Sequence, residues 1–96
     1  MATVEKTERE LNDAKVQLEK AEKALEEFVK GGDGQWLEVL KGRLRGEGGT
    51  AAQREEWKAE KNELAEEKKR LEAEVTRWSV EVTEWGAKLR ELDTRP

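Results

Sequence analysis

The chain lacks the side chains that most enzymes use as bases and nucleophiles. Its 96 residues include no His, no Cys and no Tyr, so imidazole, thiolate and phenolate groups are all missing. The single serine, Ser79, has no such base to activate it. Carboxylates are numerous, but on solvated helix faces nothing would shift their pKa values towards catalysis. The sequence therefore predicts no catalytic residue and a protein that is not an enzyme.

Motifs for cofactors and metals are missing as well. The segment Gly31-Gly32-Asp33-Gly34 has neither the preceding strand nor the spacing of a phosphate-binding loop. The absence of Cys excludes thiolate metal sites, and no motif supports a site made of carboxylates alone. We predict no cofactor, no metal and no small-molecule ligand.

Charge argues against nucleic acid and membrane partners. The net charge is −4, which disfavours phosphate-rich surfaces. Lys41, Arg43 and Arg45 form a basic cluster, but residues 33–62 carry six basic and six acidic side chains. A nucleic-acid-binding helical arm is therefore the least favoured function. No apolar stretch approaches the roughly 20 residues of a membrane span, and the start lacks the apolar core of a signal peptide. We expect an intracellular location.

Heptad periodicity predicts that long helices position the remaining side chains. The chain is 44% charged and 34% hydrophobic, too polar for an ordinary globular core, but its apolar residues recur at helical spacing. The first stripe comprises Val4, Thr7, Leu11, Ala14, Leu18, Ala21, Leu25 and Phe28. The second comprises Trp57, Lys61, Leu64, Lys68, Leu71, Val75, Trp78, Val82, Trp85, Leu89 and Leu92.

The two stripes are complementary when the chain folds back on itself. Leu11 then faces Trp85 and Leu18 faces Trp78, so that paired residue numbers have a constant sum. This is the geometry of an antiparallel helical hairpin. We predict an all-α fold and one module over residues 1–96, in which a long helix packs against a broken one.

Glycines and capping residues set the expected helix boundaries at 3–30, 34–45 and 51–93. Gly31 and Gly32 are expected to end the first helix in a left-handed cap, and Asp33 to cap the short helix. Thr50 followed by Gln53 fits a capping box at the start of the long helix.

The stripe positions are the expected seam of the hairpin, and two further surfaces are candidates for a partner. The seam residues are Leu11, Leu18, Leu25, Leu71, Val75, Trp78, Val82, Trp85 and Leu89. The candidate partner residues are Trp36, Leu37, Leu40, Ala73, Val80 and Ala87. The first three could line a groove beside the glycine break. The last three belong to an outer row of the long helix, where small residues either reflect helix propensity or admit a second hairpin.

Several polar and aromatic side chains leave alternatives open. Tryptophans at the seam more often fill space than anchor a partner. Lys61 and Lys68 occupy seam positions, where they can extend their ammonium groups to water or set the oligomeric state. The row formed by Glu60, Glu67, Glu74 and Glu81 finds no cation on the first helix. It either faces water or meets a basic partner.

These features favour an interaction or oligomerisation module, and we expect it to be part of a larger protein, for example a scaffold. A hairpin this small buries little surface, so we expect a homodimer, with four helices docked together or with long helices exchanged at a glycine break. The alternative is a recruitment module that binds a partner helix near Trp36 and Leu40.

Overall fold

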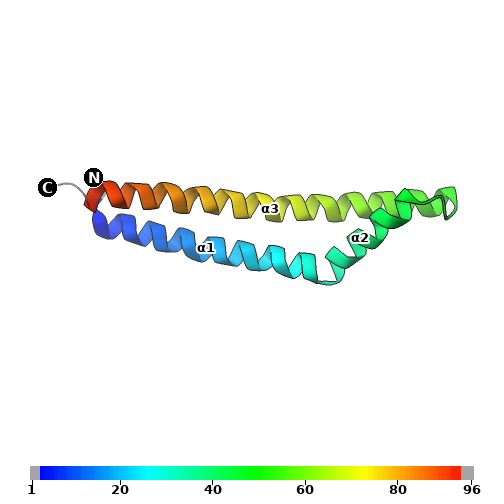
Figure 1. Ribbon diagram of the computed structural model, residues 1–96, viewed down its shortest axis with the longest axis horizontal. Helices are drawn as coiled ribbons and strands as arrows, with labels where there is room; N and C mark the ends of the chain where they lie inside the picture. The colour runs from blue at the N-terminus through cyan, green and yellow to red at the C-terminus, as the bar shows by residue number, and fades with distance from the viewer. Residues whose placement is uncertain (1–2, 94–96) are drawn as a thin grey trace. The chain divides into compact units, whose positions relative to one another are not determined.

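The computed structural model describes residues 3–93, which form three helices (Figure 1). These are α1 (Val4–Lys30), α2 (Gly32–Arg45) and α3 (Ala51–Asp93). Residues 3–93 contain no strand. The long helix α3 packs against the shorter α1 and α2, which confirms the all-α helical hairpin.

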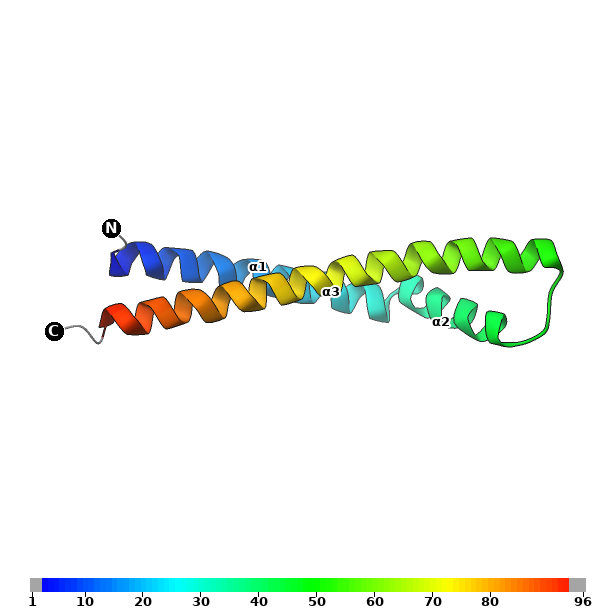
Figure 2. The same ribbon diagram turned by 90° about the horizontal axis from the view of Figure 1, so that it is seen from above.

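Contacts divide the chain into two compact units. Of the described residues, the first unit holds 3–23 and 73–93, and the second holds 24–72. In the first unit, the start of α1 lies antiparallel beside the end of α3 in both views (Figures 1 and 2). In the second unit, α2 lies beside the first part of α3.

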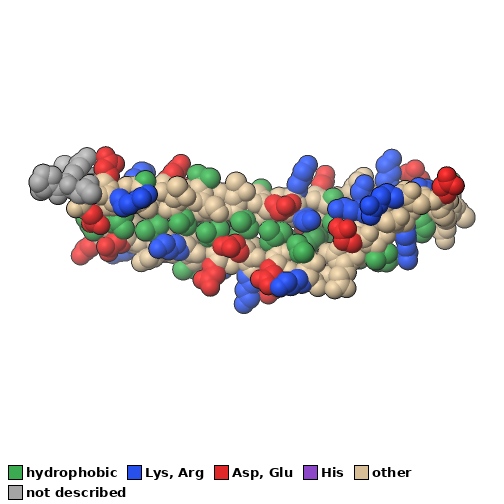
Figure 3. Space-filling model, viewed as in Figure 1, with side chains coloured by type: hydrophobic (Ala, Val, Ile, Leu, Met, Phe, Trp, Pro, Cys, Tyr) green, Lys and Arg blue, Asp and Glu red, His purple; other side chains and the backbone are tan. Residues whose placement is uncertain are grey.

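Packing in the first unit follows the heptad stripe of α1. Thr7, Leu11 and Ala14 occupy successive stripe positions and are all buried. The facing part of α3 contributes Trp78 and Trp85, which are half-buried, and hydrophobic side chains form a row between the two helices (Figure 3). Small residues on α1 leave room for bulky side chains opposite, as interdigitated packing requires.

The second unit has a core of its own, made by Phe28, Leu37 and Leu40, all of which are buried. Gly34 allows the tight joint between α1 and α2, because a Cβ there would overlap the carbonyl oxygens of Phe28 and Val29. The close approach of backbone to backbone therefore requires a residue without a side chain.

The start of α2 corrects two sequence predictions. The N-cap is Gly31 rather than Asp33, and Gly31 has extended backbone (φ −82°, ψ −177°) rather than the predicted left-handed conformation. A single residue thus separates α1 from α2. The Gln35 N–H donates to the Gly31 carbonyl at 3.1 Å, and its side-chain amide donates to the Lys30 carbonyl at 3.1 Å. Asp33 lies inside the first turn, where a carboxylate favours the helix dipole.

The predicted capping box at the start of α3 is confirmed. The Gln53 N–H donates to the Thr50 hydroxyl at 3.1 Å, and the Thr50 N–H donates to the Gln53 side-chain oxygen at 3.0 Å. These two bonds satisfy donors that the end of a helix otherwise leaves free.

Candidate interaction site

The predicted seam residues all lie in the interior or at its edge. Leu11 is buried. The other eight are half-buried: Leu18, Leu25, Leu71, Val75, Trp78, Val82, Trp85 and Leu89. The burial is unequal between helices, because α3 contains no buried residue at all between Ala51 and Asp93. The apolar stripe of α3 therefore keeps part of its surface in contact with water.

The predicted groove beside the glycine break is not open. Leu37 and Leu40 are 1% and 0% exposed, respectively, because they form the core of the second unit. They cannot line a docking surface in this conformation. The outer row on α3 is accessible, as expected: Ala73 and Ala87 are exposed, and Val80 is 50% exposed.

Trp36 is tied to α3 instead of standing free as an anchor. Its indole N–H donates to the Glu60 carboxylate at 2.8 Å. The Arg43 guanidinium lies 5.0 Å from the centre of the Trp36 ring and 5.3 Å from that of Trp57, within the range of a cation–π contact with each. The two indoles, one from each helix, therefore share one cation at the interface of α2 with α3.

In the first unit, tryptophan N–H groups donate hydrogen bonds to two other carboxylates of the row formed by Glu60, Glu67, Glu74 and Glu81. Trp78 donates to Glu74 at 3.1 Å, and Trp85 donates to Glu81 at 3.0 Å. Sequence reasoning looked for cations opposite this row and did not consider indoles one helical turn away. Because an indole N–H is a neutral donor, these bonds orient the carboxylates without cancelling their charge.

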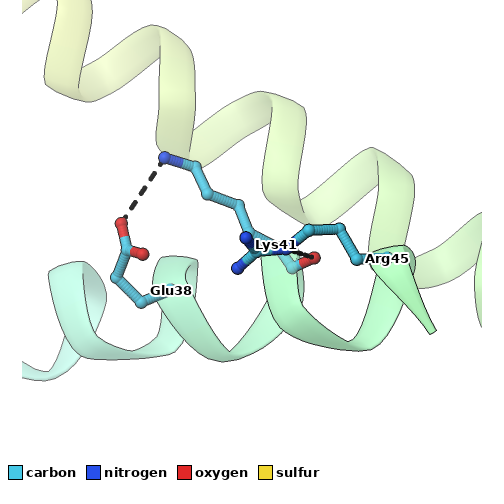
Figure 4. Close-up of polar contacts among 3 residues, drawn as sticks. All are labelled: Glu38, Lys41 and Arg45. Atoms are coloured by element: carbon cyan, nitrogen blue, oxygen red, sulfur yellow. Dashed lines mark hydrogen bonds and ion pairs between the residues drawn. The ribbon is translucent and has the colours of Figure 1, made fainter.

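A basic hollow of about 570 Å³ opens in the second unit, lined by Glu38, Lys41, Leu44, Arg45 and Lys61. Figure 4 shows the Lys41 ammonium directed at the Glu38 carboxylate, 3.5 Å away. The Arg45 Nε donates to the Lys41 carbonyl at 3.4 Å. Both contacts are long and exposed, so they fix the side chains weakly. The hollow offers charged contacts to a protein surface but no general base or nucleophile of the usual kind.

The two seam lysines are half-buried. Lys61 lines the basic hollow. Lys68 lines a small cavity of about 50 Å³ together with Phe28, Gly34 and Leu37. Each thus lies at the edge of the apolar interior of the second unit, the position in which a long side chain packs its stem and hydrates its charged end.

Arg54 makes three hydrogen bonds in the second unit, and sequence reasoning missed it. Its guanidinium donates to three backbone carbonyls: Leu44 at 2.9 Å, Gly46 at 2.8 Å and Gly48 at 2.9 Å. A signal was available in the heptads. Arg54 precedes Lys61 and Lys68 at intervals of seven and therefore continues the row of cations at seam positions.

An exposed ion pair near the end of α1 shifts the pKa values of its members. The Lys30 ammonium lies 2.7 Å from the Glu26 carboxylate. Their hydrogen bond and mutual attraction lower the pKa of Glu26 and raise that of Lys30. Both groups lie in water, so the pair supports the helix only slightly.

Residues 3–93 contain neither a cluster of potential metal ligands nor a helix that could span a membrane. No group of three or more potential ligands is arranged to hold a metal ion, and no described helix combines the length and apolar character needed to cross a membrane. Comparison with known proteins adds no assignment: no protein-family model, no curated protein and no solved structure matches this chain.

Proposed function

We propose that this protein is a non-enzymatic interaction module that associates with a second copy of itself. The observation that supports this most directly is the incomplete burial of α3. It presents a heptad stripe with three tryptophans, yet none of its residues is buried. Apolar surface left in water is the driving force for association.

The first unit offers the surface for a second copy. Ala73, Val80 and Ala87 form an exposed row on α3, on the face of the helix that points away from Trp78 and Trp85. Small side chains allow a second helix to approach closely, and Val80, which is 50% exposed, supplies apolar surface that docking would bury. Docking of two copies through this row would form the expected four-helix arrangement.

Size supports the same proposal. A single domain below about 70–80 residues rarely gains more than a few kcal/mol from its core, and each unit here is smaller than that. Covering α3 with a second copy would add burial that one chain does not supply.

Sedimentation equilibrium tests the proposal. We expect a concentration-dependent dimer, and we expect Val80→Glu to weaken it by placing a charge in the outer row. Thr83→Glu is the matched control, because Thr83 is exposed on the same helix but lies outside the row. A chain that stays monomeric at high micromolar concentration would refute the proposal.

The other two functions considered from the sequence gain no support. The recruitment groove would need Leu37 and Leu40 on the surface, whereas both are buried. In the basic cluster, Lys41 faces a carboxylate and Arg43 is held against two indoles, so neither side chain is directed at a phosphate. The intracellular location stays a prediction, which cell fractionation would test.

A further inference from the structure

We propose that Arg54 keeps α2 and α3 paired within one chain, so that copies associate as closed hairpins instead of exchanging α3. This inference rests on the proposed self-association and specifies its route. The segment concerned is the closed turn, residues 46–50, which connects the two helices.

The physical argument starts from what helix exchange preserves. In an exchanged dimer, α3 of each copy packs against the α1 and α2 of the other, and every contact between helices is retained. Only contacts that require the connecting segment to be closed are lost. The balance between closed and exchanged forms is therefore set by the closed turn itself.

Arg54 makes two such contacts. It lies on α3, and its acceptors Gly46 and Gly48 lie in the turn. Its third bond, to Leu44, joins α3 to α2 and would be retained on exchange. Carbonyls at the end of a helix have no partner within that helix, so one guanidinium satisfies acceptors that opening would expose. Hydrogen bonds from a charged donor are stronger than those between neutral groups.

Gly49 provides a second, independent constraint on the same turn. It has φ +86°, the only positive φ within residues 3–93, which favours glycine. The Trp57 ring covers it so closely that a Cβ would lie 2.7 Å from the nearest ring carbon. An alanine at this position would be strained by its backbone and by the indole. Gly48 is the natural comparison, because a Cβ there would meet nothing within 4 Å and its φ is not positive.

The experiment compares Arg54→Ala and Gly49→Ala with two matched controls, Arg45→Ala and Gly48→Ala. Since the chain has no Cys, cysteines introduced at the exposed residues Asn12 and Glu84 can carry spin labels. Both positions lie in the first unit. Electron–electron distance measurements then report whether the labelled segments of one chain lie together.

Refolding with an excess of unlabelled chain separates the two forms. In a closed hairpin, the short distance is internal to one chain and survives dilution. In an exchanged dimer, each labelled α1 pairs with an unlabelled α3, and the short distance disappears. We expect the wild type and both controls to keep it. We expect Arg54→Ala to raise the ratio of exchanged to closed chains by at least about tenfold, the effect of losing one charge-assisted hydrogen bond.

The outcomes are distinguishable from those that test self-association. Loss of the short distance in the wild type would overturn the role of Arg54, and so would its full retention in both Arg54→Ala and Gly49→Ala. If circular dichroism shows that Arg54→Ala does not fold, the proposal is tested by Gly49→Ala and Gly48→Ala alone. It then requires that Gly49→Ala lose the short distance and that Gly48→Ala keep it. A monomeric wild type would instead refute the proposed function. The label distances in the variants would still test whether Arg54 and Gly49 keep the turn closed.

Discussion

Replacement of Leu40 by alanine tests whether the second unit depends on its small core. Leu40 is 0% exposed, whereas its neighbour Val39 is 43% exposed. Truncation of a buried leucine to alanine costs about 2–5 kcal/mol, since transfer free energy and packing are both lost. A change on the surface shifts stability by about 0.5 kcal/mol. We therefore expect Leu40→Ala to destabilise the second unit severely and Val39→Ala to leave it nearly unchanged.

The four tryptophans allow the loss of stability to be measured separately in each unit. Trp36 and Trp57 lie in the second unit, and Trp78 and Trp85 lie in the first. With 5-fluorotryptophan, urea titration followed by fluorine NMR gives one transition for each indole. For Leu40→Ala, the Trp36 and Trp57 transitions should move to lower urea. An equal shift of these two transitions in Val39→Ala would refute the argument, because burial would then not distinguish the two positions.

Three further predictions concern single side chains. Thr7 is buried, and its hydroxyl lacks a hydrogen-bond partner. Thr7→Val should therefore stabilise the chain by about 1 kcal/mol and raise its melting temperature. A lower melting temperature would contradict this reasoning. Thr50→Ala removes half of the capping box and should cost about 0.5–2 kcal/mol, with faster amide exchange at Gln53 as the direct readout. The lowered pKa of Glu26 means that its pair with Lys30 contributes stability above the ordinary carboxyl pKa and loses it as pH falls through the lowered value. The raised pKa of Lys30 gives the opposite limit: stability is present below the ordinary lysine pKa and is lost as pH rises through the raised value. In Lys30→Met, an NMR titration should show the pKa of Glu26 rising, and an unchanged pKa would show that the pair does not exist in solution.

The helices could be predicted from the sequence because their signals are local. Heptad spacing and the pair Thr50 and Gln53 depend only on neighbours along the chain, and the long helix begins at Ala51, the predicted residue. The joint before α2 was predicted less well. Asp33 is a good N-cap by residue type, but the close approach of Gly34 to the end of α1 moves the start of α2 back to Gly32.

The candidate site was harder to predict because it depends on which face of α2 is covered. Trp36, Leu37 and Leu40 form one apolar group in the sequence, yet the structure buries the leucines and gives the indole a carboxylate partner. The contacts of Arg54 span up to ten residues and end on backbone carbonyls. Because every residue has a carbonyl, residue types alone cannot identify such an acceptor.

The cations at seam positions explain how pairing in the second unit can be specific. An apolar side chain at the position of Arg54 would pack against almost any apolar stripe, since the hydrophobic effect has no direction. A guanidinium instead needs acceptors at defined positions, and it finds three where α2 ends and the turn begins. A shift of α2 along α3 would remove these acceptors and leave a partly buried charge unpaired, which costs more than the lost bonds alone. Polar residues at seam positions therefore weaken the core but discriminate between registers that an apolar seam would tolerate.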